Sequence, residues 1–216
     1  MKIYRPKLRV LRLASLVIVT TLVFSVSCAT LPPRNIDDVC YLFDKNYDWY
    51  IAAKRTHEKW GSPPHITMAI MHQESSFRAK AKPPRTKILG FIPGPRKSTA
   101  FGYAQALDPT WAMYLKKSGL READRDDFSD AIDFIGWYNH YTHRRNKIAL
   151  SDAERLYLAY HEGQGGYSRG TYRKKPWLMG VAKKVKRQAS SYQSQLATCR
   201  ADLETWTIKR WFTSLI

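Results

Sequence analysis

Residues 62–77 read SPPHITMAIMHQESSF and give the strongest fold signal in this chain of 216 residues. Ser62 in the N-cap position and Pro63 in the first turn predict the start of a helix. The apolar spacing that follows carries this helix to about Ser76. This segment therefore predicts a buried helix around which the other elements are to be placed.

Glu74 lies on the apolar stripe of that helix, because it follows Ile66 and Ile70 at steps of four residues. It also lies near the C-terminal end of the helix. Desolvation and the negative end of the helix dipole both disfavour a charged carboxylate there. A carboxyl that stays protonated near neutral pH is what a general acid needs. The alternative is a solvated glutamate at a helix end, which is the commoner fate of this residue type.

The helical pattern extends outward on both sides of this segment. A capping box formed by Ser151 and Glu154 marks one further start, and Gly163 marks the corresponding end. Helices are predicted over residues 36–60, 63–76, 108–115, 129–144, 151–163 and 178–203. The sequence therefore predicts a mainly α domain over residues 36–205, followed by an aromatic C-terminal tail over residues 206–216.

Residues 79–100 break the pattern with four prolines, two glycines and six basic residues. This composition predicts a long loop with a small β-hairpin around Ile88–Ile92. Long loops inside compact domains are usually functional or mobile. The basic loop is therefore expected to form a lid or to alter a binding groove.

The N-terminus resembles an export signal, since residues 1–27 hold five basic residues and no acidic one, and an apolar run follows the basic ones. The small residues before Cys28 resemble a bacterial lipobox, although Ser25 stands where Leu or Val is usual. The favoured interpretation is a signal peptide (1–27), a lipidated Cys28 and a tether over residues 28–35. The alternative is an uncleaved membrane anchor, because the apolar run is long enough to span a bilayer. Ala29 directly after the cysteine favours the outer membrane, by the usual pattern of bacterial lipoproteins.

Export changes how the charge is interpreted. The full chain carries a net charge of +18, and loss of residues 1–27 lowers it to +13. A basic exported protein is expected to meet an anionic envelope polymer or lipid rather than nucleic acid. Peptidoglycan fits, because its stem peptides carry carboxylates. The alternative is a basic surface without a specific partner.

Three cysteines are present, and lipidation of Cys28 would leave Cys40 and Cys199 as a pair. Each of the two falls on the apolar face of a predicted helix. In an oxidising compartment such a pair is a candidate disulfide. Two separate buried thiols are the alternative.

Two further clusters contain residues suited to a binding site. Residues 101–105 read FGYAQ, in which Gly102 permits a sharp turn and Gln105 offers both a donor and an acceptor to sugar groups. Residues 159–163 read AYHEG, in which Tyr160 places a hydroxyl at a helix end. Taken singly, these are also compatible with an ordinary turn and a C-capping glycine.

Taken together and in order, ESSF (74–77), GYAQ (102–105) and AYHEG (159–163) resemble the motifs of SLT-type lytic transglycosylases. The resemblance covers roughly residues 62–170. It implies a lysozyme-like fold and cleavage of the MurNAc–GlcNAc β-1,4 bond with formation of a 1,6-anhydromuramoyl end. It implies Glu74 as the sole catalytic carboxyl, with Ser75 and Tyr160 supporting it.

The resemblance also implies the residues that contact the substrate, which are Gly102, Tyr103, Gln105, His161 and Glu162. Two of these depart from the family pattern, since His161 replaces the usual Asn and Glu162 the usual small residue. Glu162 is a candidate second carboxyl, which would permit hydrolysis by a goose-type lysozyme. A non-catalytic peptidoglycan-binding lipoprotein is the other alternative.

No cofactor is expected, and no metal site either, because His140 and His143 lack a third ligand in a recognised spacing. The oligomeric state is left open by the sequence.

Overall fold

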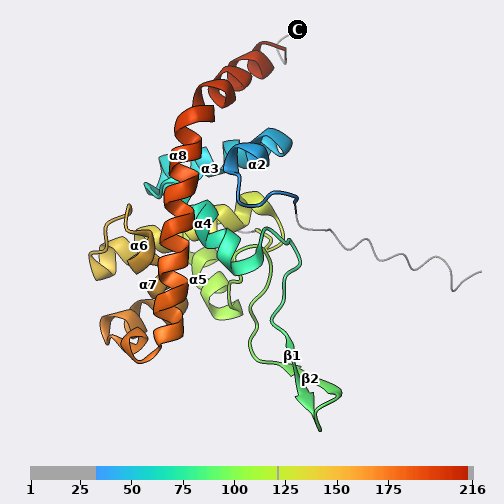
Figure 1. The fold of residues 1–216 in the computed structure, drawn as a ribbon, viewed down its shortest axis with the longest axis vertical. Helices are drawn as coiled ribbons and strands as arrows, with labels where there is room; N and C mark the ends of the chain where they lie inside the picture. The colour runs from blue at the N-terminus through green and yellow to red at the C-terminus, as the bar shows by residue number, and fades with distance from the viewer. Residues whose placement is uncertain (1–32, 121, 214–216) are drawn as a thin grey trace, which may run out of the picture. The chain divides into compact units, whose positions relative to one another are not determined.

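The structure is a computed structural model that describes residues 33–120 and 122–213 (Figure 1). In chain order the elements are α2 (Val39–Lys45), α3 (Tyr47–Trp60), α4 (Pro64–Ser75), β1 (Arg85–Ile88), β2 (Ile92–Arg96), α5 (Asp108–Ser118), α6 (Phe128–Asn146), α7 (Ala153–Ser168), the 3-10 helix η1 (Thr171–Lys174) and α8 (Pro176–Thr213). The predicted mainly α fold and the small hairpin are both confirmed.

The long helix α8 organises the domain, because α2, α4 and α7 all pack along it (Figure 1). Its apolar face is buried along most of its length, at Leu178, Val185, Tyr192, Leu196 and Leu203. These residues recur at the helical spacing that the sequence shows, so the predicted inner face is confirmed. The helix α4, which carries Glu74, is thereby fixed against a rigid support.

A disulfide between Cys40 and Cys199 joins α2 to α8, with 6.1 Å between the two Cα atoms. The predicted pairing is confirmed. Gln195 reinforces the junction, since its Oε1 accepts a hydrogen bond from the Val39 amide at 2.8 Å and its Nε2 donates to the Asp37 carbonyl at 3.0 Å. The chain-entropy model gives about 4–5 kcal/mol for closing a loop of this length.

Several helix ends differ from the prediction, because nearby side chains compete for the backbone groups. The expected helix over residues 36–60 is divided at Asn46, whose backbone and side-chain N–H groups both donate to the Leu42 carbonyl and end α2. Ser62 is buried and accepts a hydrogen bond from Asn139, so Pro63 takes the N-cap position of α4. Asp152, not Ser151, caps α7 through the Arg155 amide.

The later helices are longer than predicted. The helix α7 does not end at Gly163 but only kinks there, because that glycine has φ 71° and ψ 156° and the helix resumes to Ser168. The helix α5 reaches Ser118, and α8 continues past the expected boundary at residue 205 to Thr213.

The predicted signal peptide and Cys28 lie outside the described residues. Among residues 33–120 and 122–213, no helix combines the length and the apolar character needed to cross a bilayer.

Candidate active site

Glu74 lies in the last turn of α4, where the fully buried Ile66 and Ile70 hold its face of the helix against the core. Its side chain is half-buried. Burial raises the pKa of Glu74 to about 7, and a hydrogen bond from the Tyr157 hydroxyl opposes part of this rise. The carboxyl is therefore divided between its protonated and ionised forms near neutral pH, as an acid/base catalyst requires.

The chain turns sharply directly after Glu74. Ser76 and Phe77 both have left-handed backbones, with φ 51° and 58°, which costs free energy for residues with side chains. Burial of Phe77, which is 2% exposed, stabilises this turn. Ser75 is also buried, and its hydroxyl donates to the Met71 carbonyl at 3.3 Å. In this structure Ser75 therefore stabilises the end of the helix that carries Glu74.

Two tyrosines of α7 approach Glu74. Tyr157 and Tyr160 are three residues apart and so lie on one face of the helix. Tyr157 is 4% exposed and donates the hydrogen bond to the Glu74 carboxyl. Tyr160 lies close enough for the Glu74 charge to raise its pKa, although burial is the larger cause. The AYHEG motif indicates Tyr160 but not Tyr157, which lies outside it and could have been found only from its same-face spacing to Tyr160.

The GYAQ segment meets the same helix face. The Tyr160 hydroxyl donates to the backbone carbonyl of Ala104 at 2.6 Å. Ala104 is fully buried, so this hydrogen bond is shielded from water. The structure thus brings all three sequence motifs together, with Glu74, Tyr160 and Ala104 in one continuous cluster.

Gly102 shapes the backbone of this second motif. Its φ is 79°, and a Cβ atom at this position would lie 1.9 Å from the Arg125 carbonyl oxygen. Only glycine fits such a close approach. The Arg125 side chain then donates to the carbonyls of Thr99 and Ala106 and pairs with Asp108 at 2.8 Å. Arg125 is a positioning residue that the sequence analysis did not identify, because its partners are far from it along the chain.

The other two residues of this motif have packing roles. The Gln105 amide nitrogen donates to the carbonyls of Ala81 and Gly102, at 2.9 Å each, and so connects the loop to the turn. Tyr103 packs edge-on against Trp49 and Phe128, whose rings stack with centroids 4.1 Å apart. In this structure both side chains organise the walls around the site.

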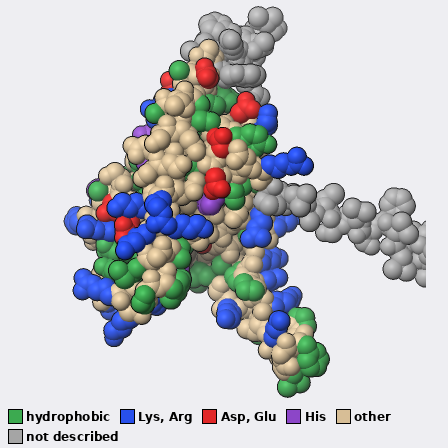
Figure 2. All heavy atoms as spheres, in the orientation of Figure 1, with side chains coloured by type: hydrophobic (Ala, Val, Ile, Leu, Met, Phe, Trp, Pro, Cys, Tyr) green, Lys and Arg blue, Asp and Glu red, His purple; other side chains and the backbone are tan. Residues whose placement is uncertain are grey.

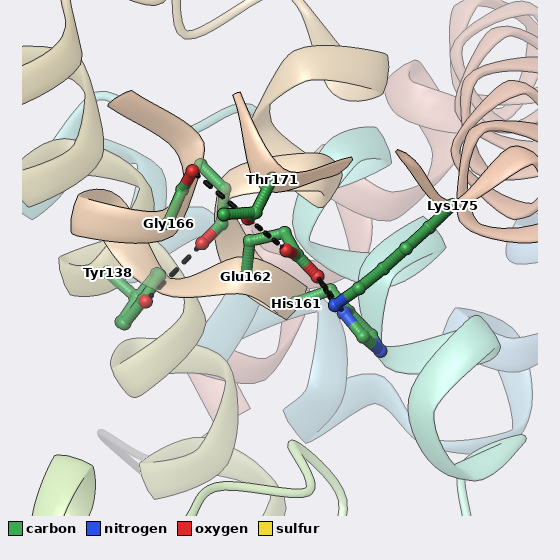
Figure 3. A network of polar contacts seen from close by, with 7 residues as sticks. Tyr138, His161, Glu162, Gly166, Thr171 and Lys175 are labelled. Carbon is green, nitrogen blue, oxygen red and sulfur yellow. Dashed lines mark hydrogen bonds and ion pairs between the residues drawn. The ribbon is translucent and has the colours of Figure 1, made fainter. Parts of the chain in front are cut away.

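Glu162 lies in a separate polar network at the junction of α7 and η1 (Figure 3). Its side chain is 4% exposed and contacts Lys175 at 2.7 Å, Thr171 and His161. Burial alone would raise the pKa of Glu162, but the hydrogen bonds from Lys175, Thr171 and His161 and the Lys175 charge outweigh it and lower the pKa to about 2. This carboxyl is therefore ionised and fully occupied by partners near neutral pH.

His161 lies at the surface beside this network. Its ring meets the exposed ring of Trp177 edge-on, with 5.2 Å between centroids, and its Nδ1 lies 3.1 Å from Glu162. Trp177, at the start of α8, is a solvent-facing aromatic that the sequence analysis did not place near the AYHEG motif. An exposed aromatic beside an imidazole offers a surface against which a sugar ring can pack.

Within residues 33–120 and 122–213, no cluster of three or more His, Cys, Asp or Glu side chains is arranged to hold a metal ion. A carboxyl with a pKa of about 7 can donate and accept a proton near neutral pH, so the surroundings of Glu74 suit proton transfer.

A mainly helical domain in which three sequence motifs meet around a carboxyl with a pKa of about 7 suits the class of enzymes that cleave glycans. The profile of the transglycosylase SLT domain matches residues 16–199, and the chain therefore belongs to this family. It is a lytic transglycosylase, an enzyme of the periplasm whose substrate is peptidoglycan. No curated protein and no solved structure shows a significant match to the chain.

Proposed function

We propose that the enzyme cleaves the MurNAc–GlcNAc β-1,4 bond with Glu74 as the sole general acid and base, and that it releases a 1,6-anhydroMurNAc end. The observation that carries this proposal is the raised pKa of Glu74, about 7, in the one place where the three family motifs meet. A carboxyl with this pKa can both donate and accept a proton near neutral pH.

The reaction needs two proton transfers at one carboxyl. Protonated Glu74 gives its proton to the glycosidic oxygen, and the GlcNAc hydroxyl leaves. The resulting carboxylate then takes the proton of the muramoyl 6-hydroxyl as that oxygen attacks C1. The acetamido group of the substrate stabilises the positive charge between the two steps, so a second enzyme carboxylate is not required. Tyr157 orients Glu74 through its hydrogen bond, and Tyr160 holds Tyr157's helix face against Ala104.

The environment of Glu162 favours this mechanism over that of a goose-type lysozyme. A general base must have a lone pair directed at its water, whereas Glu162 is ion-paired with Lys175 and hydrogen-bonded to Thr171. Its pKa of about 2 also makes it a weak base. We assign it the role of anchoring η1 against α7, with His161 and Trp177 facing the substrate.

Digestion of purified sacculi followed by mass spectrometry tests the reaction. The expected products carry anhydromuramoyl ends, which are lighter than reducing ends by one water. Glu74→Gln is expected to lower the rate at least about a hundredfold without unfolding the protein, while Glu162→Gln keeps most of the activity. If the wild type instead produces reducing ends, and Glu162→Gln does not, the enzyme is a hydrolase that uses Glu162. Binding to sacculi without any soluble product from wild type would establish the non-catalytic lipoprotein.

We further propose that Cys28 is lipidated and tethers the enzyme to a membrane, the outer one being favoured. The support is the basic and then apolar N-terminal pattern, followed by small residues and a cysteine. Metabolic labelling with an alkyne fatty acid should mark the wild type and not Cys28→Ala. An unlabelled wild-type chain that stays in the membrane fraction would establish the uncleaved anchor.

A further inference from the structure

The β1–β2 hairpin projects away from the helices (Figure 1). Its two strands pair antiparallel with each other, with Arg85 opposite Arg96 and Ile88 opposite Ile92. The Thr86 hydroxyl adds a hydrogen bond to the Pro95 carbonyl at 2.8 Å. The hairpin is therefore a defined element with its tip in solvent, and packing against the domain does not explain its side chains.

The tip of the hairpin is strongly apolar. Ile88, Leu89, Phe91 and Ile92 are 50%, 79%, 76% and 42% exposed, and they make up four of the seven large hydrophobic side chains exposed in the described residues. Figure 2 shows them as one green cluster at the end of the projection. A contiguous apolar patch of this kind marks a binding surface.

The turn itself contains a residue that folding does not favour. Leu89 and Gly90 both have positive φ, at 53° and 82°, and the Phe91 amide donates to the Ile88 carbonyl at 3.4 Å. Turns of this kind favour Asn or Asp ahead of glycine, because these residues tolerate the left-handed region best. A leucine there adds exposed apolar area at a conformational cost, so its presence does not serve the stability of the turn.

The stem of the hairpin below this tip carries cations. Arg85, Lys87 and Lys97 are exposed, and residues 79–100 contain no acidic residue. Figure 2 shows blue side chains along the same projection. An apolar tip above a stem that carries exposed Lys and Arg matches the interface of a bilayer that contains anionic lipids, where the tip enters the acyl boundary and the cations meet headgroups.

We propose that this hairpin docks onto a lipid bilayer through Leu89 and Phe91, with Arg85 and Lys87 on anionic headgroups. A lid over a sugar polymer would lie against the helical domain, whereas this hairpin projects away from the helices and its tip is exposed. The contact would fix the orientation of the domain at the membrane surface. It does not depend on the assignment of Glu74, so its failure leaves the proposed reaction untouched.

A probe at the tip of the full-length chain tests the proposal. Phe91→Cys is labelled with nitrobenzoxadiazole, and the chain is reconstituted in vesicles of phosphatidylcholine with phosphatidylglycerol and a doxyl-labelled lipid. Doxyl quenching and a blue shift are expected at position 91. The matched control is Met179→Cys, an exposed apolar position on α8, where neither is expected. The parent chain, treated in the same way, reports any label on Cys28.

Two changes sharpen the result. Leu89→Asn suits the turn and removes apolar area, so tip quenching should fall while the fold is kept. Lys87→Gln should lower the ratio of inserted to free hairpin about fivefold, which corresponds to about 1 kcal/mol for one cation at an anionic surface, whereas Lys116→Gln on α5 should not. Equal quenching at 91 and 179 overturns the proposal. A blue shift of the probe at position 91 on addition of sacculi without lipid overturns the proposal in favour of a lid. A blue shift on raising the protein concentration alone overturns it in favour of contact with a second copy of the chain.

Discussion

Glu74 on α4 and Glu162 on α7 show how the same type of side chain acquires opposite protonation behaviour in two regions of the molecule. Glu74 meets neutral groups, namely the Tyr157 hydroxyl and buried carbon, and its pKa rises to about 7. Glu162 is also buried but meets Lys175, Thr171 and His161, and its pKa falls to about 2. Burial alone therefore does not decide the protonation state of a carboxyl. The partners that accompany burial do.

The largest effect is expected at the backbone that supports the Glu74 region. Gly102→Ala should lower the free energy of unfolding by more than about 3 kcal/mol, because a Cβ would meet the Arg125 carbonyl at 1.9 Å. Gly119→Ala is the matched control: its φ of 76° is similar, but its Cβ would have no neighbour within 4 Å. At Gly119 only the cost of a left-handed backbone for alanine should remain, which is about 1–2 kcal/mol. Chemical denaturation measures both, and equal losses would contradict the steric argument.

The next effect concerns Glu74 and pH. Since its folded pKa is raised, the protonated form favours folding, and this stability is lost as pH rises through about 7. Glu74→Gln removes the free-energy cost of holding an ionised carboxylate in this desolvated position. The variant should therefore be more stable than the wild type above pH 8 by up to about 3 kcal/mol, with little change below pH 5. Denaturation across this pH range measures it. A gain that is independent of pH would show that Glu74 is not desolvated.

The opposite sign is expected at Glu162. Its depressed pKa means that the ionised form favours folding. This stabilisation is fully present above the ordinary pKa of a glutamate, and it is lost as pH falls through about 2. Glu162→Gln should therefore cost about 1–2 kcal/mol at pH 7, because Lys175 loses its partner while remaining partly solvated. Thermal unfolding tests this. A stabilised variant would break the comparison of the two carboxyls.

The smallest effect is a shift in the pH profile. The hydrogen bond from Tyr157 lowers the pKa of Glu74, so Tyr157→Phe should raise that pKa and move the alkaline limb of activity to higher pH by about one unit or less. Tyr160→Phe, which loses its bond to Ala104 instead, should lower activity without this shift. Turnover measured from pH 5 to pH 9 distinguishes the two tyrosines. Identical profiles would show that Tyr157 does not act on Glu74.

The local patterns predicted more of the helices than of their ends. The buried positions of α8 and the pairing of Cys40 with Cys199 followed from apolar spacing and from the number of cysteines. The predictions of Ser62 and Ser151 as helix caps were wrong. Ser62 accepts a hydrogen bond from Asn139 instead, and Asp152 takes the N-cap position of α7. Cap residues are chosen by whichever neighbour reaches the free amides, and that is a property of the packed chain.

The sequence by itself determined the mainly α class, the order of the three motifs and the position of Glu74 on an apolar stripe, because these depend on periodicities along one chain. Only the tertiary structure decided that Tyr157 bonds Glu74, that Arg125 fixes the glycine turn and that Lys175 holds Glu162 ionised. Each of these is a contact between distant segments. The protonation state of a carboxyl depends on all the groups within a few ångströms, and folding alone brings those groups together.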